Sequence, residues 1–472
     1  MQLTGWLFLR LLALIYFIAF MSLGGQIAGL AGPQGILPFE RYLSQVETNL
    51  GQPVAWLWLP NLFWWTGAGD LALQAVAYLG AALSLPLLLG RGERALLILL
   101  FLLYLSLYHA GQVFTNFQWD TLLLECGFLA IFLPGGANRL LIFLFEWLLF
   151  RLRFMSGFFK LFSGDPSWAG LTTLNHYFET QPLPHIGAWY AHQLPDWLLK
   201  SGVVLTLFSE LVVPLFIFLP RPFRYAAAGI TVLMQLLIMA TSNHNFINLL
   251  TIALCLFLLG DRLVERVLPQ GIQRRIEERR QRPGRVKPLL VTLAFLLIVP
   301  ASLIGFTQRI GNEPLPAPLL SLYDSVRRFG IGNIYHIYPT MQTQRQELII
   351  QGSMDGKAWR SYAFKYKPGD PTRRPPFNIP QQPRLDWMIW FVPTQQPIQM
   401  YWFGKFMRRL QQGSSSVTGL LADNPFPEQP PSYLRVLAYR YEFTHAQERE
   451  KSHAWWNITY LGEFPRVQPR RP

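Results

Sequence analysis

Charged residues are scarce in this chain of 472 residues: Asp, Glu, Lys and Arg together make up 14%, whereas hydrophobic residues make up 51%. Soluble domains carry about a quarter charged residues, so the shortfall indicates a protein that folds in lipid. So much apolar surface also excludes a disordered chain. Cysteine is nearly absent, since only Cys126 and Cys255 are present and both lie in apolar runs. A disulfide scaffold and a cysteine zinc cluster are therefore excluded.

Long apolar runs dominate the first 306 residues. Runs of about 17–25 apolar residues can cross a bilayer. The first run has no Ala-x-Ala cleavage pattern, so it is predicted to be a retained helix rather than a signal peptide. The tract 56–65, rich in Trp, is predicted to lie in the membrane interface as an aromatic belt. We predict nine transmembrane helices, the fourth and eighth being short: 6–30, 71–89, 95–114, 119–133, 140–162, 203–219, 225–240, 246–259 and 288–306.

Basic residues alternate between the connections. The even-numbered connections hold Arg91 and Arg94, then Arg139, then Arg221 and Arg224, and finally eight Arg and one Lys against four acids in 261–287. The positive-inside rule then places the N-terminus in the cytoplasm and the chain after the ninth span on the opposite side. We interpret the arginine run 274–285 as a contact with anionic membrane lipids, so no nucleic acid is expected as a partner.

From about residue 307 the long apolar runs end, and short alternating stretches are separated by turn signals such as Asp355-Gly356. The predicted fold is therefore a polytopic α-helical membrane domain followed by a β-rich soluble C-terminal domain. The predicted divisions are 1–260 membrane domain, 261–287 basic cytoplasmic linker, 288–306 last transmembrane helix and 307–472 extracytoplasmic domain. The predicted strands are 346–351, 362–366, 387–392 and 434–443, and Arg373, Arg374, Arg384 and Asp386 are predicted to pin loops.

Ionisable residues inside apolar spans are costly and mark functional sites by default. They concentrate in the fourth to sixth spans, and on the fifth a spacing of seven puts Glu146, Arg153 and Lys160 on one helical face. Two interpretations stay open: the acids and bases pair with one another as internal struts, or they line a functional cavity. The residues concerned are Asp120, Glu125, Glu146, Arg151, Arg153, Lys160 and Glu210.

The connection 163–200 is unusually rich in aromatic and hydrogen-bonding residues, which is typical of a functional loop. We predict a site centred on Lys160, with Asp120 as second candidate catalytic residue; the alternative is that Lys160 is an interfacial anchor. The histidines of the connection 163–200 match no metal-ligand spacing, so no metal is predicted. The other candidate binding residues are Trp119, Glu125, Arg153, Trp168, Asn175, His176, Tyr177, Glu179, Thr180, Gln181, His192 and Glu210.

Several runs spread over almost the whole chain resemble the lipase maturation factor family. They are 116–129, 156–172, 175–184, 191–195, 364–370, 373–377, 382–388, 424–427 and 439–441. In animals, proteins of this family lie in the endoplasmic reticulum membrane and help homodimeric lipases to fold and assemble. The resemblance therefore implies a chaperone-like factor without a cofactor, whose partner is a secreted or exported lipase-like client.

This sequence departs from an animal secretory protein in three respects. It has no Lys-Asp-Glu-Leu-type tail, it has too few cysteines for a disulfide-exchange role, and its loops are compact. We therefore expect a bacterial inner membrane protein, or an endoplasmic reticulum protein if the source is eukaryotic, in which case Asn457-Ile458-Thr459 is a glycosylation sequon.

A second resemblance suggests an alternative function. Gly157-x-x-Lys160 followed by Trp168-x-Gly170 is similar to the segment of the vitamin K-dependent carboxylase-like membrane domain that carries a catalytic lysine, although the spacing differs. It implies an enzyme that uses Lys160 as a base on a quinone-like or lipid substrate. A transporter, the third hypothesis, is disfavoured because no two-half repeat is visible.

Overall fold

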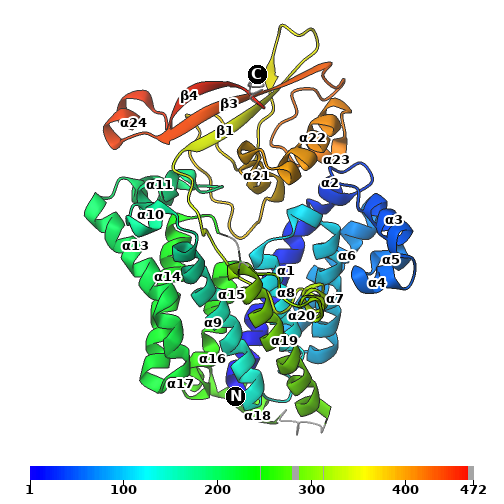
Figure 1. Ribbon diagram of the computed structural model, residues 1–472, viewed down its shortest axis with the longest axis vertical. Helices are drawn as coiled ribbons and strands as arrows, with labels where there is room; N and C mark the ends of the chain where they lie inside the picture. Colours follow the sequence, from blue (N-terminus) through cyan, green and yellow to red (C-terminus); the bar gives the residue numbers. More distant parts are fainter. Residues whose placement is uncertain (245, 279–285, 312, 466–472) are drawn as a thin grey trace.

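The computed structural model describes residues 1–244, 246–278, 286–311 and 313–465. A helical bundle carries a smaller C-terminal region at one end, and the N-terminus lies at the opposite end (Figure 1). The helices before residue 311 are α1 Leu3–Gly24, α2 Ile27–Ala31, α3 Phe39–Leu50, α4 Val54–Trp58, α5 Phe63–Thr66, α6 Asp70–Leu88, α7 Glu93–Ala110, η1 Gln112–Phe114, α8 Gln118–Ala130, α9 Arg139–Phe162, α10 Pro166–Ala169, α11 Thr173–Thr180, α12 Ile186–His192, α13 Asp196–Leu211, η2 Val213–Phe218, α14 Arg221–Thr241, α15 Ile247–Leu254, α16 Leu256–Leu259, α17 Asp261–Val267, α18 Gln270–Glu278 and α19 Val286–Ile310.

Within the described residues, six helices are long and apolar enough to cross a membrane: α1, α6, α7, α13 with η2, α14 and α19. A bent pair, Ile247–Leu259 with Asp261–Val267 at 112°, makes a seventh if it is one span. The predicted count of nine is not confirmed. The fourth predicted span is only the 13-residue helix α8, and α9, although 24 residues long, carries Glu146, Arg151, Arg153 and Lys160.

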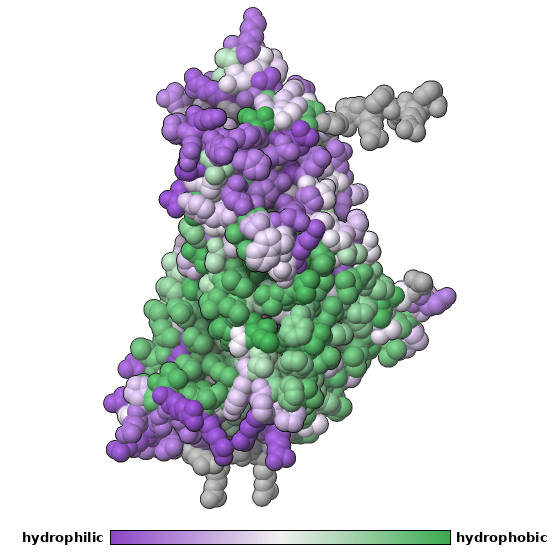
Figure 2. Space-filling view, turned by 90° about the vertical axis from the view of Figure 1, so that its left-hand side faces the viewer, coloured by the Kyte–Doolittle hydropathy of each residue, from purple (hydrophilic) through white to green (hydrophobic). Residues whose placement is uncertain are grey.

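On the face shown in Figure 2, an apolar band covers the bundle between a hydrophilic C-terminal region and a hydrophilic opposite end. Exposed leucines such as Leu233, Leu236 and Leu237 on α14 contribute to it. Side chains of this kind lower the free energy of the protein only when lipid covers them. The chain is therefore a multi-pass membrane protein.

The basic connections gather at the end that holds the N-terminus. Arg94 and Lys287 both donate to the Pro134 carbonyl, at 3.2 and 3.1 Å, and Asp261 accepts hydrogen bonds from the Gln2 and Thr4 amides. This grouping agrees with the charge alternation in the sequence. The assignment of this end to the cytoplasm stays a prediction, and residues 279–285 of the arginine run lie outside the described residues.

The C-terminal region contains a small antiparallel sheet of four strands: β1 Arg345–Ser353, β2 Arg360–Ser361, β3 Tyr433–Phe443 and β4 Trp456–Glu463. Their order in the sheet is β2-β1-β3-β4. Leu348 of β1 pairs with Ala438 of β3. The pairing of β3 with β4 contains a β-bulge or irregularity between Ala438 and Tyr439. The elements after residue 311 are α20 Ala317–Arg327, β1 Arg345–Ser353, β2 Arg360–Ser361, α21 Arg384–Ile389, η3 Val392–Thr394, α22 Pro397–Gln411, α23 Ser415–Thr418, β3 Tyr433–Phe443, α24 Ala446–Ser452 and β4 Trp456–Glu463.

The predicted strands 346–351 and 434–443 are confirmed as β1 and β3. The predicted strand 387–392 is wrong, because helix α21 occupies its first half and η3 its end. All six residues of α21 are buried, and a short apolar run buried on every side has the same pattern in a helix as in a strand. The predicted strand 362–366 contributes only an isolated bridge at Ala363.

The segment that joins α19 to β1 packs on the helical bundle. Tyr323 and Val326 of α20, together with Ile331 and Tyr335, belong to the bundle core. The change in composition near residue 307 therefore does not coincide with a change of packing partner. A second core unites β1, β3, α21, α22 and α23 with Leu30, Ile36, Leu37 and Phe114 of the membrane part. The two regions thus share their cores.

Candidate functional site

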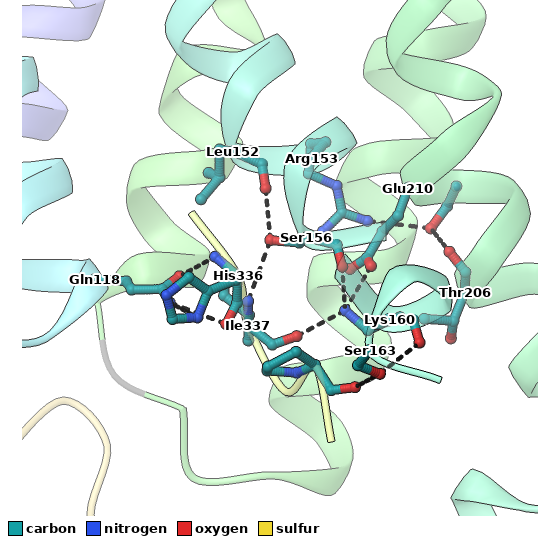
Figure 3. A network of polar contacts seen from close by, with 12 residues as sticks. Gln118, Leu152, Arg153, Ser156, Lys160, Ser163, Thr206, Glu210, His336 and Ile337 are labelled. Carbon is teal, nitrogen blue, oxygen red and sulfur yellow. Dashed lines mark hydrogen bonds and ion pairs between the residues drawn. The ribbon is translucent and has the colours of Figure 1, made fainter. Parts of the chain in front are cut away.

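Lys160 lies in the last turn of α9 and is only 3% exposed. Its Nζ donates to Glu210 Oε2 at 2.6 Å, to the Ile337 carbonyl at 2.8 Å and more weakly to the Ser156 carbonyl at 3.4 Å (Figure 3). The Trp168 ring lies 5.2 Å from the same nitrogen. The side chain therefore points into the protein, which excludes the snorkelling geometry of an interfacial anchor.

Glu210 of α13 serves two cations. Its Oε1 lies 3.4 Å from Arg153 Nη1, while its Oε2 binds Lys160. Arg153 also donates to Ser209 Oγ at 3.1 Å. Among the described residues, Glu210 is the one carboxylate in ion-pair contact with either cation. The cluster therefore holds one net positive charge, which the Ile337 carbonyl and the Trp168 ring partly balance.

Gly157 permits this cluster, because α9 and α13 touch at this position. A Cβ added to Gly157 would lie 2.8 Å from Glu210 Cβ and 2.9 Å from its backbone carbonyl carbon. Any larger residue would push the two helices apart and move the Glu210 carboxylate away from Lys160. The Gly-x-x-Lys spacing in the sequence therefore has a packing reason in the tertiary structure.

Asp120 belongs to a different cluster of contacts from Lys160, so the described hydrogen bonds and ion pairs do not join the two predicted catalytic residues. Its carboxylate accepts from Arg384 Nη1 and Nη2 at 2.6 and 2.7 Å and from the Tyr104 hydroxyl at 2.6 Å. Arg384 also lies 5.8 Å from the Trp119 ring. Asp120 and Arg384 are both fully buried and 264 residues apart in the chain. This bidentate pair connects α8 of the bundle to α21 of the C-terminal region.

Glu125 forms a third buried cluster, with Arg151. Arg151 donates to the Glu125 carboxylate and to the Asn333 carbonyl, the latter at 2.8 Å, while the Tyr335 hydroxyl donates to Glu125 at 3.3 Å. A fourth pair joins Arg224 to Glu146 near the opposite end of the bundle. Of the two interpretations of the intramembrane charges, internal pairing is therefore the one that the described contacts support.

The connection 163–200 folds into the short helices α10, α11 and α12 and packs against the sheet. Glu179 accepts from the Phe443 amide at 3.0 Å, and the Thr180 carbonyl accepts from Trp390 Nε1 at 2.6 Å. Gln181 donates to the Thr241 carbonyl at 3.1 Å. Tyr177 contacts His244 Nε2 through its hydroxyl at 2.8 Å. Most of the predicted loop residues therefore hold the loop between α14 and the C-terminal region.

Three predicted loop residues lie apart from Lys160 in other contacts. Asn175 donates to Asp196 at 2.9 Å, the His176 carbonyl accepts from Thr180, and His192 Nε2 lies 3.8 Å from Glu179. Burial raises the pKa of Glu179 and lowers the pKa of His192 to about 4. His192 is therefore neutral near pH 7, and its contact with Glu179 is no ion pair. No group of three or more His, Cys, Asp or Glu in the described ranges could hold a metal ion.

Sequence reasoning missed Arg345, which organises the contact between loop and sheet. This buried first residue of β1 donates to the carbonyls of Glu179 and Pro182, both at 2.9 Å, and to that of Gln181. It also pairs with Glu347, which in turn binds Lys367 at 2.8 Å. A lone arginine at the start of a strand gives no sequence signal, because the carbonyls that it binds lie more than 160 residues away.

Two of the predicted loop-pinning residues have that role in the structure. Asp386 accepts from the amides of Tyr366 and Lys367 at 2.6 and 3.0 Å. Arg373 donates to the Phe364 carbonyl at 2.9 Å. Arg384 instead connects the two regions through Asp120, so its partner lies outside the C-terminal region.

Comparison with known proteins agrees with this architecture in both regions. The model of the lipase maturation factor transmembrane domain matches residues 3–266, which is more than half of the chain, and the model of the family's C-terminal domain matches 331–466. The chain belongs to the lipase maturation factor family. The family's transmembrane domain thus covers the bundle up to α17, and its C-terminal domain covers the sheet and α21–α24.

Curated relatives match over most of their length. Lipase maturation factor 2 of Gallus gallus is 34% identical, over 97% of this chain and 80% of the relative. Lipase maturation factor 2 of Xenopus tropicalis is 32% identical, over 95% and 80%. Lipase maturation factor 1 of Bos taurus is 33% identical, over 98% and 88%. No solved structure matches the chain.

Proposed function

We propose that this chain is a chaperone-like factor, embedded in the membrane, that assists the folding or maturation of secreted or exported clients such as lipases. The names of the relatives support a lipase-like client. The observation that carries the proposal is the Asp120–Arg384 pair, which fixes the C-terminal region on one end of the bundle. A surface held in a constant position beside the membrane suits capture of a client as it leaves the bilayer.

The sheet edge formed by β4 is the client surface that we propose. On β4, Tyr460 is 55% exposed and Ile458 is 44% exposed. Exposed aromatic side chains of this kind are enriched where proteins bind one another. Residues 308–472 carry 21 Lys plus Arg against 12 acids, which favours an acidic client surface.

A photoreactive amino acid at position 460 should crosslink the full-length protein to a secreted hydrolase during its synthesis. The same amino acid at position 357 is the matched control, since it lies in the exposed turn that joins β1 to β2, and β2 is the edge strand opposite β4. Adducts at 460 that are absent at 357 are expected, and mass spectrometry identifies the client. Equal labelling at both positions, or no hydrolase at 460, would count against the proposal.

The alternative is an enzyme related to the carboxylase-like domain, with Lys160 as a base on a quinone-like or lipid substrate. It is supported by the convergence of Gly157, Lys160 and Trp168 at one cluster. Against it, the acceptors around Nζ are those that an ammonium group needs. The alternative requires a quinone that co-purifies with the wild-type protein and is lost in Lys160→Ala. Lipid extraction and chromatography without a quinone would eliminate it.

A further inference from the structure

A basic cavity of about 310 Å³ lies between α3 of the bundle and α22 of the C-terminal region. Four cationic side chains line it: Arg41, Lys405, Arg408 and Arg409. No Asp or Glu is among the lining residues, whose remaining polar side chains are glutamines and tyrosines. The cavity is separate from the Lys160 and Asp120 clusters, and neither cluster shares a residue with it.

Helix α22 presents its basic face to this cavity. Tyr401, Lys405 and Arg408 follow one another at intervals of four and three residues, so they lie on one side of the helix. The other side carries Phe406 and Leu410, both fully buried in the core of the C-terminal region. Packing thus fixes the orientation of α22 and keeps its basic face toward the cavity.

Helix α3 supplies the opposite wall, with Arg41 pointing into the same space. Within the part of the chain that the structure describes, none of the four cations forms an ion pair with a carboxylate. Arg409 holds the wall in place by donating to the Gly35 and Pro33 carbonyls at 2.8 and 2.9 Å. Like charges that face one another across a cavity repel, and a bound anion removes that repulsion.

The position of the cavity favours an anion that belongs to the membrane. Helix α3 is followed directly by α4 and α5, which lie beside it at the flank of the bundle (Figure 1). There Leu57, Trp58 and Trp65 are 67%, 46% and 66% exposed. Exposed Trp side chains mark the level of the lipid headgroups, where the phosphates of phospholipids are the most abundant anions.

We propose that this cavity binds the phosphate of an anionic phospholipid from the leaflet that borders the C-terminal region. Arg41 and Arg408 contact the phosphate from opposite walls, and Arg409 positions the loop that closes the site. The bound lipid bridges α3 and α22, so it connects the membrane part to the C-terminal region independently of any client.

Native mass spectrometry of the full-length protein, extracted from vesicles of phosphatidylglycerol and phosphatidylcholine in equal amounts, tests this proposal. The wild type should retain phosphatidylglycerol in preference to phosphatidylcholine. The double variant Arg41→Gln, Arg408→Gln should retain at least tenfold less phosphatidylglycerol. A matched double variant, Lys357→Gln with Lys451→Gln, removes the same charge from exposed positions of the C-terminal region and should retain the wild-type amount.

A second measurement separates loss of binding from loss of folding. Without lipid, the cavity variant should melt in neutral detergent at no lower temperature than the wild type, because two repelling charges are gone. Equal retention of the two lipids by the wild type, or unchanged retention by the cavity variant, would overturn the proposal. So would displacement of the lipid by millimolar inorganic phosphate or by an acidic peptide, since either would identify a soluble anion as the ligand.

Discussion

Replacement of Arg384 by methionine should lower the free energy of unfolding by about 3–5 kcal/mol, the usual cost of breaking a buried ion pair from one side. The change leaves the Asp120 carboxylate fully buried with only the Tyr104 hydroxyl as partner. Desolvation of that unpaired charge is the cause of the loss. Thermal unfolding in detergent, followed by fluorescence, measures the effect.

A double-mutant cycle distinguishes the ion pair from general packing. Asp120→Asn with Arg384→Met removes both charges and should recover most of the stability that the single change loses. Arg374→Met, at an exposed position of the same region, is the control and should have little effect. Limited proteolysis should also release the C-terminal region more readily from Arg384→Met. A variant as stable and as resistant to protease as the wild type would show that the pair does not connect the two regions.

The second large effect is expected for Glu210→Gln, which removes the carboxylate shared by Lys160 and Arg153. Two buried cations would then face one another without an anion, and a loss of about 3–5 kcal/mol is expected. Lys160→Met in the same background should restore part of it, because one of the repelling charges disappears. The free energy of unfolding in detergent again gives the readout.

Glu265→Gln is the matched control, because Glu265 is exposed on α17 and has no described ion pair. The cycle also bears on the role of Lys160. If Glu210→Gln leaves stability intact while activity in client maturation is lost, the cluster is a functional site rather than an internal strut. Loss of both together would be the result expected for a strut.

Local sequence patterns were sufficient to predict the class of the protein and much of its secondary structure. Apolar runs that cover a bilayer's thickness require helices, because only a helix satisfies its backbone polar groups within one segment of chain. The alternation of basic connections identified the residues that gather at one end of the bundle. The strands β1 and β3 were visible because each is a short stretch that mixes apolar and polar residues and is set off by turn signals, which is a local pattern.

The pairing of the buried charges depends on how the helices pack, which no local pattern reveals. Asp120 and Lys160 lie in neighbouring spans of the sequence, yet Asp120 binds Arg384 and Lys160 binds Glu210 and the Ile337 carbonyl. The segment 317–341 differs in composition from the membrane part, yet its buried residues pack in the core of the helical bundle. These contacts join residues at least 50 positions apart in the chain. No local pattern of hydrophobicity or charge specifies a partner at that distance, because the packing of whole helices determines which side chains meet.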